Sequence, residues 1–330
     1  MSTDTPSIAA RSIRALRDNA VILIVLAILL LWLKLYVPVF FSPANALGLA
    51  LSISLTGMVA CTMLFCLASG DFDLSVGSVV AASGVLCAVV IGATGSIALG
   101  VAAGILGGFV VGLLNGTLIS VIGVNALIAT LGTMQIARGL AFLVSRGEAV
   151  AIPVERFFAL GSGHWLGVPV PVWVTAASFL VFGFLLGKTT FGPNTLAIGG
   201  NREAARLAGI PVTRVKVTIF ALQGMMAGFA GVVLASRAHS GQPNTSQDLA
   251  LDVISACVLG GVSLSGGVGS MGGVIIGVLI MGTVQNVMSL RNVPTFYQYI
   301  ARGSILLAAV MFDQYRRRAA ARSAAAGHKG

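Results

Sequence analysis

Charge is the scarcest property of this sequence. Only 9% of the 330 residues are charged, against roughly 25% in a soluble globular domain. A chain with so few charged residues and 57% hydrophobic residues cannot cover a folded surface with polar groups, which excludes a soluble globular protein. Its hydrophobic runs are continuous over about 20 residues, as membrane-spanning helices require, and lack the alternation of a β-barrel. The sequence therefore predicts an all-α polytopic membrane protein.

Cysteine, histidine and catalytic motifs are equally sparse. The four cysteines lie inside apolar runs and lack the spacing of a disulfide framework or a metal site, so we interpret them as packing residues. The three histidines lie far apart in the sequence. Residues 187–189 (GKT) resemble the end of a phosphate-binding loop, but that motif requires a glycine where this chain has Phe182. We therefore expect no enzyme activity and no cofactor or metal on this chain.

Ten hydrophobic runs are predicted to span the membrane. They cover about 20–38, 46–68, 74–92, 97–121, 126–144, 170–186, 215–236, 249–264, 271–288 and 297–313. They define a transmembrane domain, 20–313, between a cytoplasmic N-terminal tail, 1–19, and a basic cytoplasmic tail, 314–330. If the N-terminus is inside, thirteen of the twenty Lys and Arg residues are cytoplasmic and five are external, which agrees with the positive-inside rule. Both termini are then expected in the cytoplasm.

Two short matches indicate that the chain is duplicated. Residues 136–139 (IARG) recur at 300–303, and residues 116–118 have a counterpart at 282–284. The offsets, 164 and 166 residues, agree with half the chain length. Each half holds five predicted spans, over about 20–144 and 170–313, so the halves form two inverted five-helix repeats. Inverted repeats are typical of transporters, whose substrate path lies between the repeats.

Glycine recurs at every fourth position in two of the predicted spans. The glycines concerned are Gly100, Gly104, Gly108, Gly112 and Gly116 in the first half, and Gly269, Gly273 and Gly277 in the second. Small residues let helix backbones approach closely in a membrane, where lipid supplies no hydrophobic drive for association. We predict that these glycine faces serve packing and have no catalytic role.

Polar side chains within or between the apolar runs are the candidates for a translocation path, because burying them in a membrane is costly. They are Asp71, Asp73, Asn115, Asn125, Gln135, Arg138, Gln285, Asn286 and Arg302. The segment around Asp71 and Asp73 has two interpretations: a broken helix that exposes carboxylates to the path, or a tight turn in which Asp73 caps the next helix. The amides have a structural alternative, hydrogen bonding between helices. Either aspartate is a candidate partner for Arg138.

The segment 188–216 is a strongly basic interruption of the apolar sequence, with five cations and one anion. It contains a short alanine-rich helix, predicted over 201–208 and ended by Gly209 and Pro211. We interpret it as a cytoplasmic docking surface, with small residues entering a groove on a partner and arginines at the rim. The predicted contact residues are Asn201, Arg202, Glu203, Ala204, Ala205, Arg206, Leu207, Ala208 and Gly209.

Four segments resemble a known family. They are 57–78 (GMVACTMLFCLASGDFDLSVGS), 125–139 (NALIATLGTMQIARG), 188–212 (KTTFGPNTLAIGGNREAARLAGIPV) and 257–269 (CVLGGVSLSGGVG). The chain is similar, over most of 48–312, to the ribose/xylose/arabinose permease family, the membrane subunits of bacterial ABC sugar importers. The similarity is strongest to arabinose-transporting members. One departure is Pro193, where related sequences commonly have arginine, so no ion pair is expected there.

The resemblance implies a permease subunit of an ATP-driven importer of a pentose, expected to be L-arabinose. ATP and magnesium would bind a separate cytoplasmic ATPase, with 201–209 as the coupling element. The other implied partners are a periplasmic sugar-binding protein, a second copy of the chain as a homodimer, and the lipid of the bacterial inner membrane, but not nucleic acid. Two alternatives remain. One is an importer of ribose, xylose or galactose, and the other is a secondary transporter in which Asp71 or Asp73 carries a proton.

Overall fold

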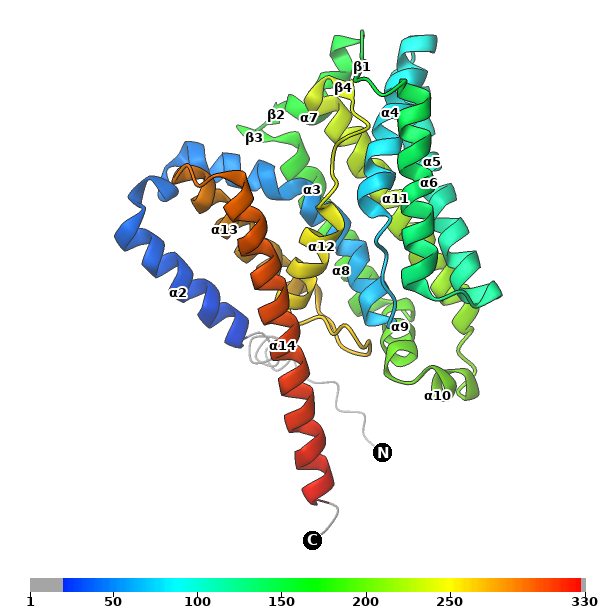
Figure 1. Cartoon of the computed structure of the whole chain (residues 1–330), viewed down its shortest axis with the longest axis vertical. Coiled ribbons are helices and arrows are strands. Elements are labelled where there is room, and N and C mark those ends of the chain that lie inside the picture. Colours follow the sequence, from blue (N-terminus) through cyan, green and yellow to red (C-terminus); the bar gives the residue numbers. More distant parts are fainter. Residues whose placement is uncertain (1–19, 328–330) are drawn as a thin grey trace.

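The computed structural model describes residues 20–327, and most of them are helical (Figure 1). Within this part of the chain, seven helices are long and apolar enough to cross a membrane. They are α3 (Pro43–Ala68), α4 (Val76–Thr94), α5 with the π-helical turn that follows it (Ile97–Ile122), α6 (Ala126–Ser145), α8 (Val170–Lys188), α11 (Val212–Ala238) and α13 (Met271–Leu290). The prediction of an all-α polytopic membrane protein is confirmed. The predicted N-terminal tail, 1–19, lies outside the described residues.

The remaining elements are helices of other lengths and two short strand pairs. The helices are α2 (Ala20–Tyr36), α7 (Ala159–Ser162), α9 (Phe191–Gly200), α10 (Arg202–Leu207), α12 (Leu249–Leu259) and α14 (Thr295–Gly327), with 3-10 turns at Pro38–Phe41 and Glu155–Phe158. Strand β1 (Val150–Ala151) pairs antiparallel with β4 (Ser240–Gly241), and β2 (His164–Trp165) pairs with β3 (Val168–Pro169).

Two of the ten predicted spans have the wrong length. Helix α12 was expected over 249–264 but has only 11 residues, because Gly260 ends it and Gly261, with φ of +82°, turns the chain away. An 11-residue helix is too short to cross a bilayer, which needs about 20 residues. Helix α14 continues to Gly327, past the predicted end at 313, because alanine and arginine, both strong helix formers, dominate the sequence there.

Helix α9 was not predicted at all, since the segment 188–200 was interpreted as a loop. It buries Gly192, Thr195 and Ile198, which lie at the spacing of one helical face. Pro193 lies in its first turn, where a missing amide proton is tolerated. Gly199 lies directly against the carbonyl oxygen of Ala68, at the end of α3. Tertiary packing therefore makes a helix of a segment whose glycines and proline resemble a loop.

Helix α11 is the central helix of the fold and packs against α5, α4 and α3. The glycine face of α5 is confirmed as a packing surface. A Cβ atom at Gly108 or Gly112 would collide with the α11 backbone at Gly224 and Phe220. The glycines therefore set how closely the two helix axes approach, as small residues do in membrane proteins.

The second glycine face is shorter than predicted. Gly273 and Gly277 lie on α13 against the backbone of Gly260 and Ala256, in and just after α12. Gly269, in contrast, precedes the helix and lies in the turn between α12 and α13, so the prediction is wrong for this residue.

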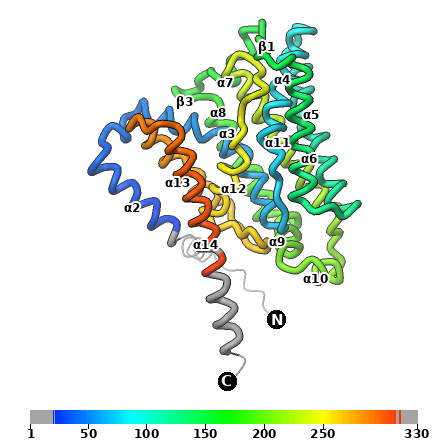
Figure 2. Tube along the Cα trace, viewed as in Figure 1, coloured from blue at the N-terminus to red at the C-terminus, as the bar shows by residue number. Residues whose placement is uncertain are grey.

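The molecule has two distinct ends (Figure 1). Helices α9 and α10 lie at one end, together with the far end of α14, and the strand pairs with α7 lie at the other. Two non-helical stretches enter the bundle from these opposite ends: the chain between α3 and α4, and the chain between β4 and α12 (Figure 2). They meet where a Cβ atom at Gly77 would touch the carbonyl oxygen of Ser246.

Candidate functional site

The non-helical stretch between α3 and α4 is a break between these two helices, and residues 71–74 have no helical structure. The carboxylate of Asp73 accepts hydrogen bonds from the backbone amide and the hydroxyl of Ser75, which is the N-cap residue of α4. The side chain of Ser75 itself makes no capping bond, and the Asp73 carboxylate caps the first turn of α4, as one interpretation expected. Asp71 and Asp73 are both buried, so the segment is a helix break inside the protein and not an exposed turn.

A buried hydrogen-bond chain fixes this break to two neighbouring helices. The Asn115 amide on α5 donates to the Ser75 hydroxyl over 3.0 Å, and the Thr133 hydroxyl on α6 donates to the Asn115 oxygen over 2.7 Å. Asp73, Ser75, Asn115 and Thr133 are all buried. Because buried polar groups are costly unless they are paired, this series of hydrogen bonds specifies where the break lies. Asn115, a predicted path residue, is thus part of the support of the break.

Arg138 on α6 connects the two non-helical stretches. Its Nε donates to the Ser78 hydroxyl on α4 over 3.2 Å, and its Nη1 donates to the carbonyl oxygens of Pro243 and Thr245 over 2.6 and 2.8 Å. The predicted pairing of Arg138 with Asp71 or Asp73 is therefore wrong. The non-helical backbone at 243–245 offers carbonyls that no helix hydrogen bond uses, and the planar guanidinium matches several acceptors at once.

An open cavity of about 280 Å³ lies beside Arg138, where the two stretches meet. Its lining residues are Leu74, Gly77, Ser78, Met134, Gln135, Arg138, Phe142 and Gln247. Guanidinium, amide and hydroxyl groups face this space beside one aromatic and two aliphatic side chains. Such a mixture suits a small solute that carries hydroxyl groups and apolar C–H faces. Of the nine predicted path residues, Gln135 and Arg138 line this cavity.

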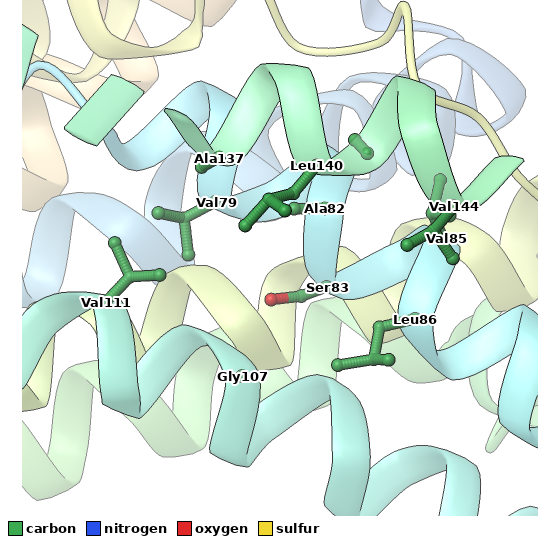
Figure 3. A pocket seen from close by; sticks show the side chains of 11 residues that line it. Val79, Ala82, Ser83, Val85, Leu86, Gly107, Val111, Ala137, Leu140 and Val144 are labelled. Atoms are coloured by element: carbon green, nitrogen blue, oxygen red, sulfur yellow. The ribbon is translucent and has the colours of Figure 1, made fainter. Parts of the chain in front are cut away.

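A second cavity, between α4, α5 and α6, is chemically different (Figure 3). It measures about 200 Å³ and is lined by aliphatic side chains such as Val79, Val111 and Leu140, with Ser83 as its one polar side chain. A ligand rich in hydroxyls would leave most of its hydrogen bonds unmade here, which is costly. We therefore place the candidate site at the cavity beside Arg138.

Arg302 occupies a comparable place in the second half. Its Nη1 lies 3.4 Å from Oδ2 of Asp252 on α12 and 3.8 Å from Oδ2 of Asp248, and its guanidinium lies over the ring of Tyr299. Gln285 on α13, a predicted path residue, lies beside the Asp252 carboxylate. This cluster holds the start of α12 against α13 and α14.

The other predicted path residues have separate surroundings. Asp71 forms a buried ion pair with Lys216 on α11, with 2.6 Å between Oδ2 and Nζ. Asn286 exchanges two hydrogen bonds with Asn45 at the start of α3. Asn125 is the exposed N-cap of α6, where its side chain accepts from the amide of Leu127. These three therefore lie apart from the cavity.

The predicted docking helix exists as α10, capped by the Asn201 side chain, which accepts from the amides of Glu203 and Ala204. One detail of the prediction is wrong: Ala205 is only 4% exposed and packs into the protein. The apolar residue that α10 presents outward is Leu207, which is 80% exposed.

Sequence reasoning missed several residues around the site. Lys216 was counted among the cations of the basic segment 188–216 and not as a buried partner, and Asp252 was overlooked within a predicted span. An acid inside an apolar helix is itself a signal of a functional or structural partner, so Asp252 was open to prediction. The carbonyls of Pro243 and Thr245 carry no signal in the side-chain sequence.

Known proteins are similar to this chain over most of its length. The family model described as "Branched-chain amino acid transport system / permease component" matches residues 45–310. The chain is 58% identical to the L-arabinose transport system permease protein AraH of Escherichia coli K12, over 92% of each chain. It is 56% identical to the L-arabinose ABC transporter permease protein AraH of Azospirillum brasilense, over 94% of this chain and 92% of that protein.

A more distant relative is the ribose import permease protein RbsC of Bacillus subtilis, which is 42% identical over 88% of this chain and 90% of that protein. No solved structure matches the chain. The predicted resemblance to sugar permeases is thus confirmed. With the family model covering most of the described helices, the chain belongs to the family of branched-chain amino acid transport system permease components.

Proposed function

We propose that this chain is the membrane-spanning permease subunit of an ATP-driven importer of L-arabinose. One observation carries the proposal: identity of 58% and 56% to two permeases named for L-arabinose, against 42% to one named for ribose, each over most of both chains. As a permease component the chain is a transport subunit and not an enzyme. ATP and magnesium are assigned to a separate ATPase chain.

The cavity beside Arg138 is the candidate point on the translocation path. Arg138, Gln135, Ser78 and Gln247 offer hydrogen bonds, and Phe142 offers an apolar wall for the C–H face of a sugar ring. The break at 71–75 and the segment 243–248 form two of its sides. This geometry supports a path for an uncharged polyol. Asp71 and Asp73 are already bound within the protein, which disfavours a freely titrating carboxylate and thus proton coupling.

Helix α10 is the candidate contact with the ATPase. It lies at one end of the molecule (Figure 1) and carries exposed Leu207 beside the surface pair of Arg206 and Glu203, whose charged atoms are 2.6 Å apart. A short helix with one exposed apolar side chain next to charged side chains fits a groove on a partner. We assign this end to the cytoplasm, in agreement with the positive-inside rule.

The remaining parts of the proposal concern architecture. We propose ten membrane segments in two inverted halves, α2 to α6 and α8 to α14, in which the short α12 completes its crossing together with the non-helical stretch before it. We also propose a homodimer in the bacterial inner membrane, with a periplasmic sugar-binding protein on the strand-bearing end. The support is that a helix break occurs in each half and that an arginine braces each one: Arg138 beside Ser78, and Arg302 beside Asp252.

The test is reconstitution of the chain in liposomes with its ATPase and candidate binding proteins. Uptake of L-arabinose, D-ribose, D-xylose and D-galactose would be measured with and without ATP. We expect ATP-dependent uptake with L-arabinose preferred. Uptake that persists without the ATPase and collapses with the proton gradient would overturn the ATP-driven mechanism. ATP-dependent uptake with ribose preferred would overturn the assignment of the sugar alone.

A further inference from the structure

The buried ion pair between Asp71 and Lys216 has no place in the cavity described above. The Lys216 side chain is 5% exposed and the Asp71 side chain 11%, so both charges are largely withdrawn from water. Burying two charges is costly even when they are paired, and well-packed neutral residues often serve stability equally well. The pair therefore requires an explanation other than stability.

The position of the pair supplies one. Lys216 lies in the first turns of α11, which follows α10 after a short connection, and Asp71 lies in the break between α3 and α4. The ion pair thus joins α11, the helix that follows α10, to the non-helical stretch that borders the Arg138 cavity. Arg202, the first residue of α10, also interacts electrostatically with the Asp71 carboxylate.

The helix before α10 contacts the same break. Gly199, near the end of α9, lies against the carbonyl of Ala68, the last residue of α3, and 2.5 Å would separate its Cβ from the amide of Gly267. That amide donates to the Ala68 carbonyl over 2.9 Å. Backbone contacts therefore join α9 to the start of the break, and the ion pair joins α11 to its next residues.

We propose that the Asp71–Lys216 ion pair is a positioning link that transmits displacement of α10 to the helix break beside the cavity. It rests on the proposed function, because α10 is taken as the contact with the ATPase. When α10 and the start of α11 move together, Lys216 carries the Asp71 carboxylate with it, and the 71–75 segment follows. Packing contacts alone resist only the approach of the two segments at this point, whereas an ion pair also resists their separation.

The decisive variant is the neutral double change Asp71→Asn with Lys216→Met, which removes both charges and nearly keeps their volumes. Because no unpaired charge is left behind, this variant is expected to fold and to assemble with the ATPase. Sugar-stimulated ATP hydrolysis and ATP consumed per sugar imported would be measured in liposomes. We expect a loss of sugar stimulation of at least about fivefold, the lower end of typical coupling between sites.

Two controls make the result specific. Lys216→Arg keeps the charge pair and should retain coupling, and Arg214→Gln removes an exposed cation two residues earlier on α11 and should do so as well. Full coupling in the double variant would overturn the proposal. Failure of the double variant to fold would also overturn it, since the pair would then be needed for the fold itself. If the wild-type complex shows no sugar-stimulated hydrolysis, the proposed function fails instead.

Discussion

At the scale of single residues, Arg138 has the most demanding role in the described chain. It supplies hydrogen bonds to Ser78 and to two backbone carbonyls of a segment more than one hundred residues away. Hydrogen bonds from a charged donor contribute about 1.5–3 kcal/mol each, and buried acceptors left without a donor are costly. The residue therefore both positions the segment 243–245 and borders the cavity.

Replacing Arg138→Gln should lower the free energy of unfolding by about 2–4 kcal/mol, because a single amide cannot reach all three acceptors. Arg138→Lys should have a free energy of unfolding between those of Arg138→Gln and the wild type, since an ammonium lacks the planar arrangement of donors of the guanidinium. Thermal unfolding of the purified protein in detergent would measure both. Arg146→Gln, at the exposed end of the same helix, is the control and should unfold like the wild type. An unfolding midpoint for Arg138→Gln equal to that control would contradict the role assigned to Arg138.

The residue type alone predicted the role of some polar side chains correctly and of others incorrectly. The cost of burying an arginine in a membrane singled out Arg138 and Arg302, and both have polar partners on other segments of the chain. Lys216 was grouped with the cations of the basic segment 188–216, because the sequence does not reveal that Asp71 lies beside it. Asn115 was named for a path, but its amide is used by Ser75 and Thr133 on neighbouring helices. Partners distant in sequence decide such roles.

At the scale of helices, the contact between α5 and α11 is the most extensive helix pair in the described fold. It depends on glycines that face each other, with Gly108 and Gly112 on one helix and Gly224 on the other. The spacing of four residues in the sequence was sufficient to predict this face. It could not predict which helix would lie against it, because α11 has only the pair Gly224 and Gly228 at this spacing, and other segments also contain glycine pairs.

Gly112→Val should destabilise the protein by about 1–3 kcal/mol, since its Cβ would meet the Phe220 carbonyl and the core cannot expand without strain. The matched control is Gly132→Val on α6, where an added Cβ meets nothing within 4 Å. Both proteins would be compared by thermal unfolding in detergent. Equal midpoints for the two variants would show that the helices separate more easily than the packing indicates.

Helix ends were harder to predict than helix existence. Most bounds agree within three residues because the apolar runs are long and clearly delimited. Helix α14, which continues 14 residues past its predicted end at 313, is one exception. Helix α12 is the other. Its apolar run continues past Leu259, and only the turn at Gly260 and Gly261 ends the helix. The break before α4 was correctly placed, but whether it is a turn or an extended stretch depends on Asn115 and Thr133, which lie far along the chain.

At the scale of the whole molecule, the two ends of the fold should face opposite sides of the membrane. Leu207 on α10 and Leu166 in the turn between β2 and β3 are 80% and 77% exposed, and α8 separates these regions. Its 19 residues extend over about 28 Å, close to the thickness of the hydrocarbon core. The four native cysteines are all buried, so they give little background for labelling.

Leu207→Cys should react with a membrane-impermeant maleimide only in inside-out vesicles, and the bound ATPase should protect it. Leu166→Cys should react only in right-side-out vesicles. Mass analysis of the labelled chains would measure both. Labelling of both positions from one side would refute the topology, and labelling at Leu207 that the ATPase leaves unchanged would refute the docking of α10.

The way Arg138 is bound has an evolutionary consequence. The guanidinium holds the segment 243–245 through main-chain oxygens, which every amino acid possesses. The side chain of Asn244 is exposed, and that of Gln247 borders the cavity a few residues further on. Substitution at 247 therefore alters the lining, and substitution at 244 alters only the exposed surface of the segment, while neither removes the carbonyls that hold it. A permease built in this way can exchange one sugar for another by point mutation while its frame stays intact.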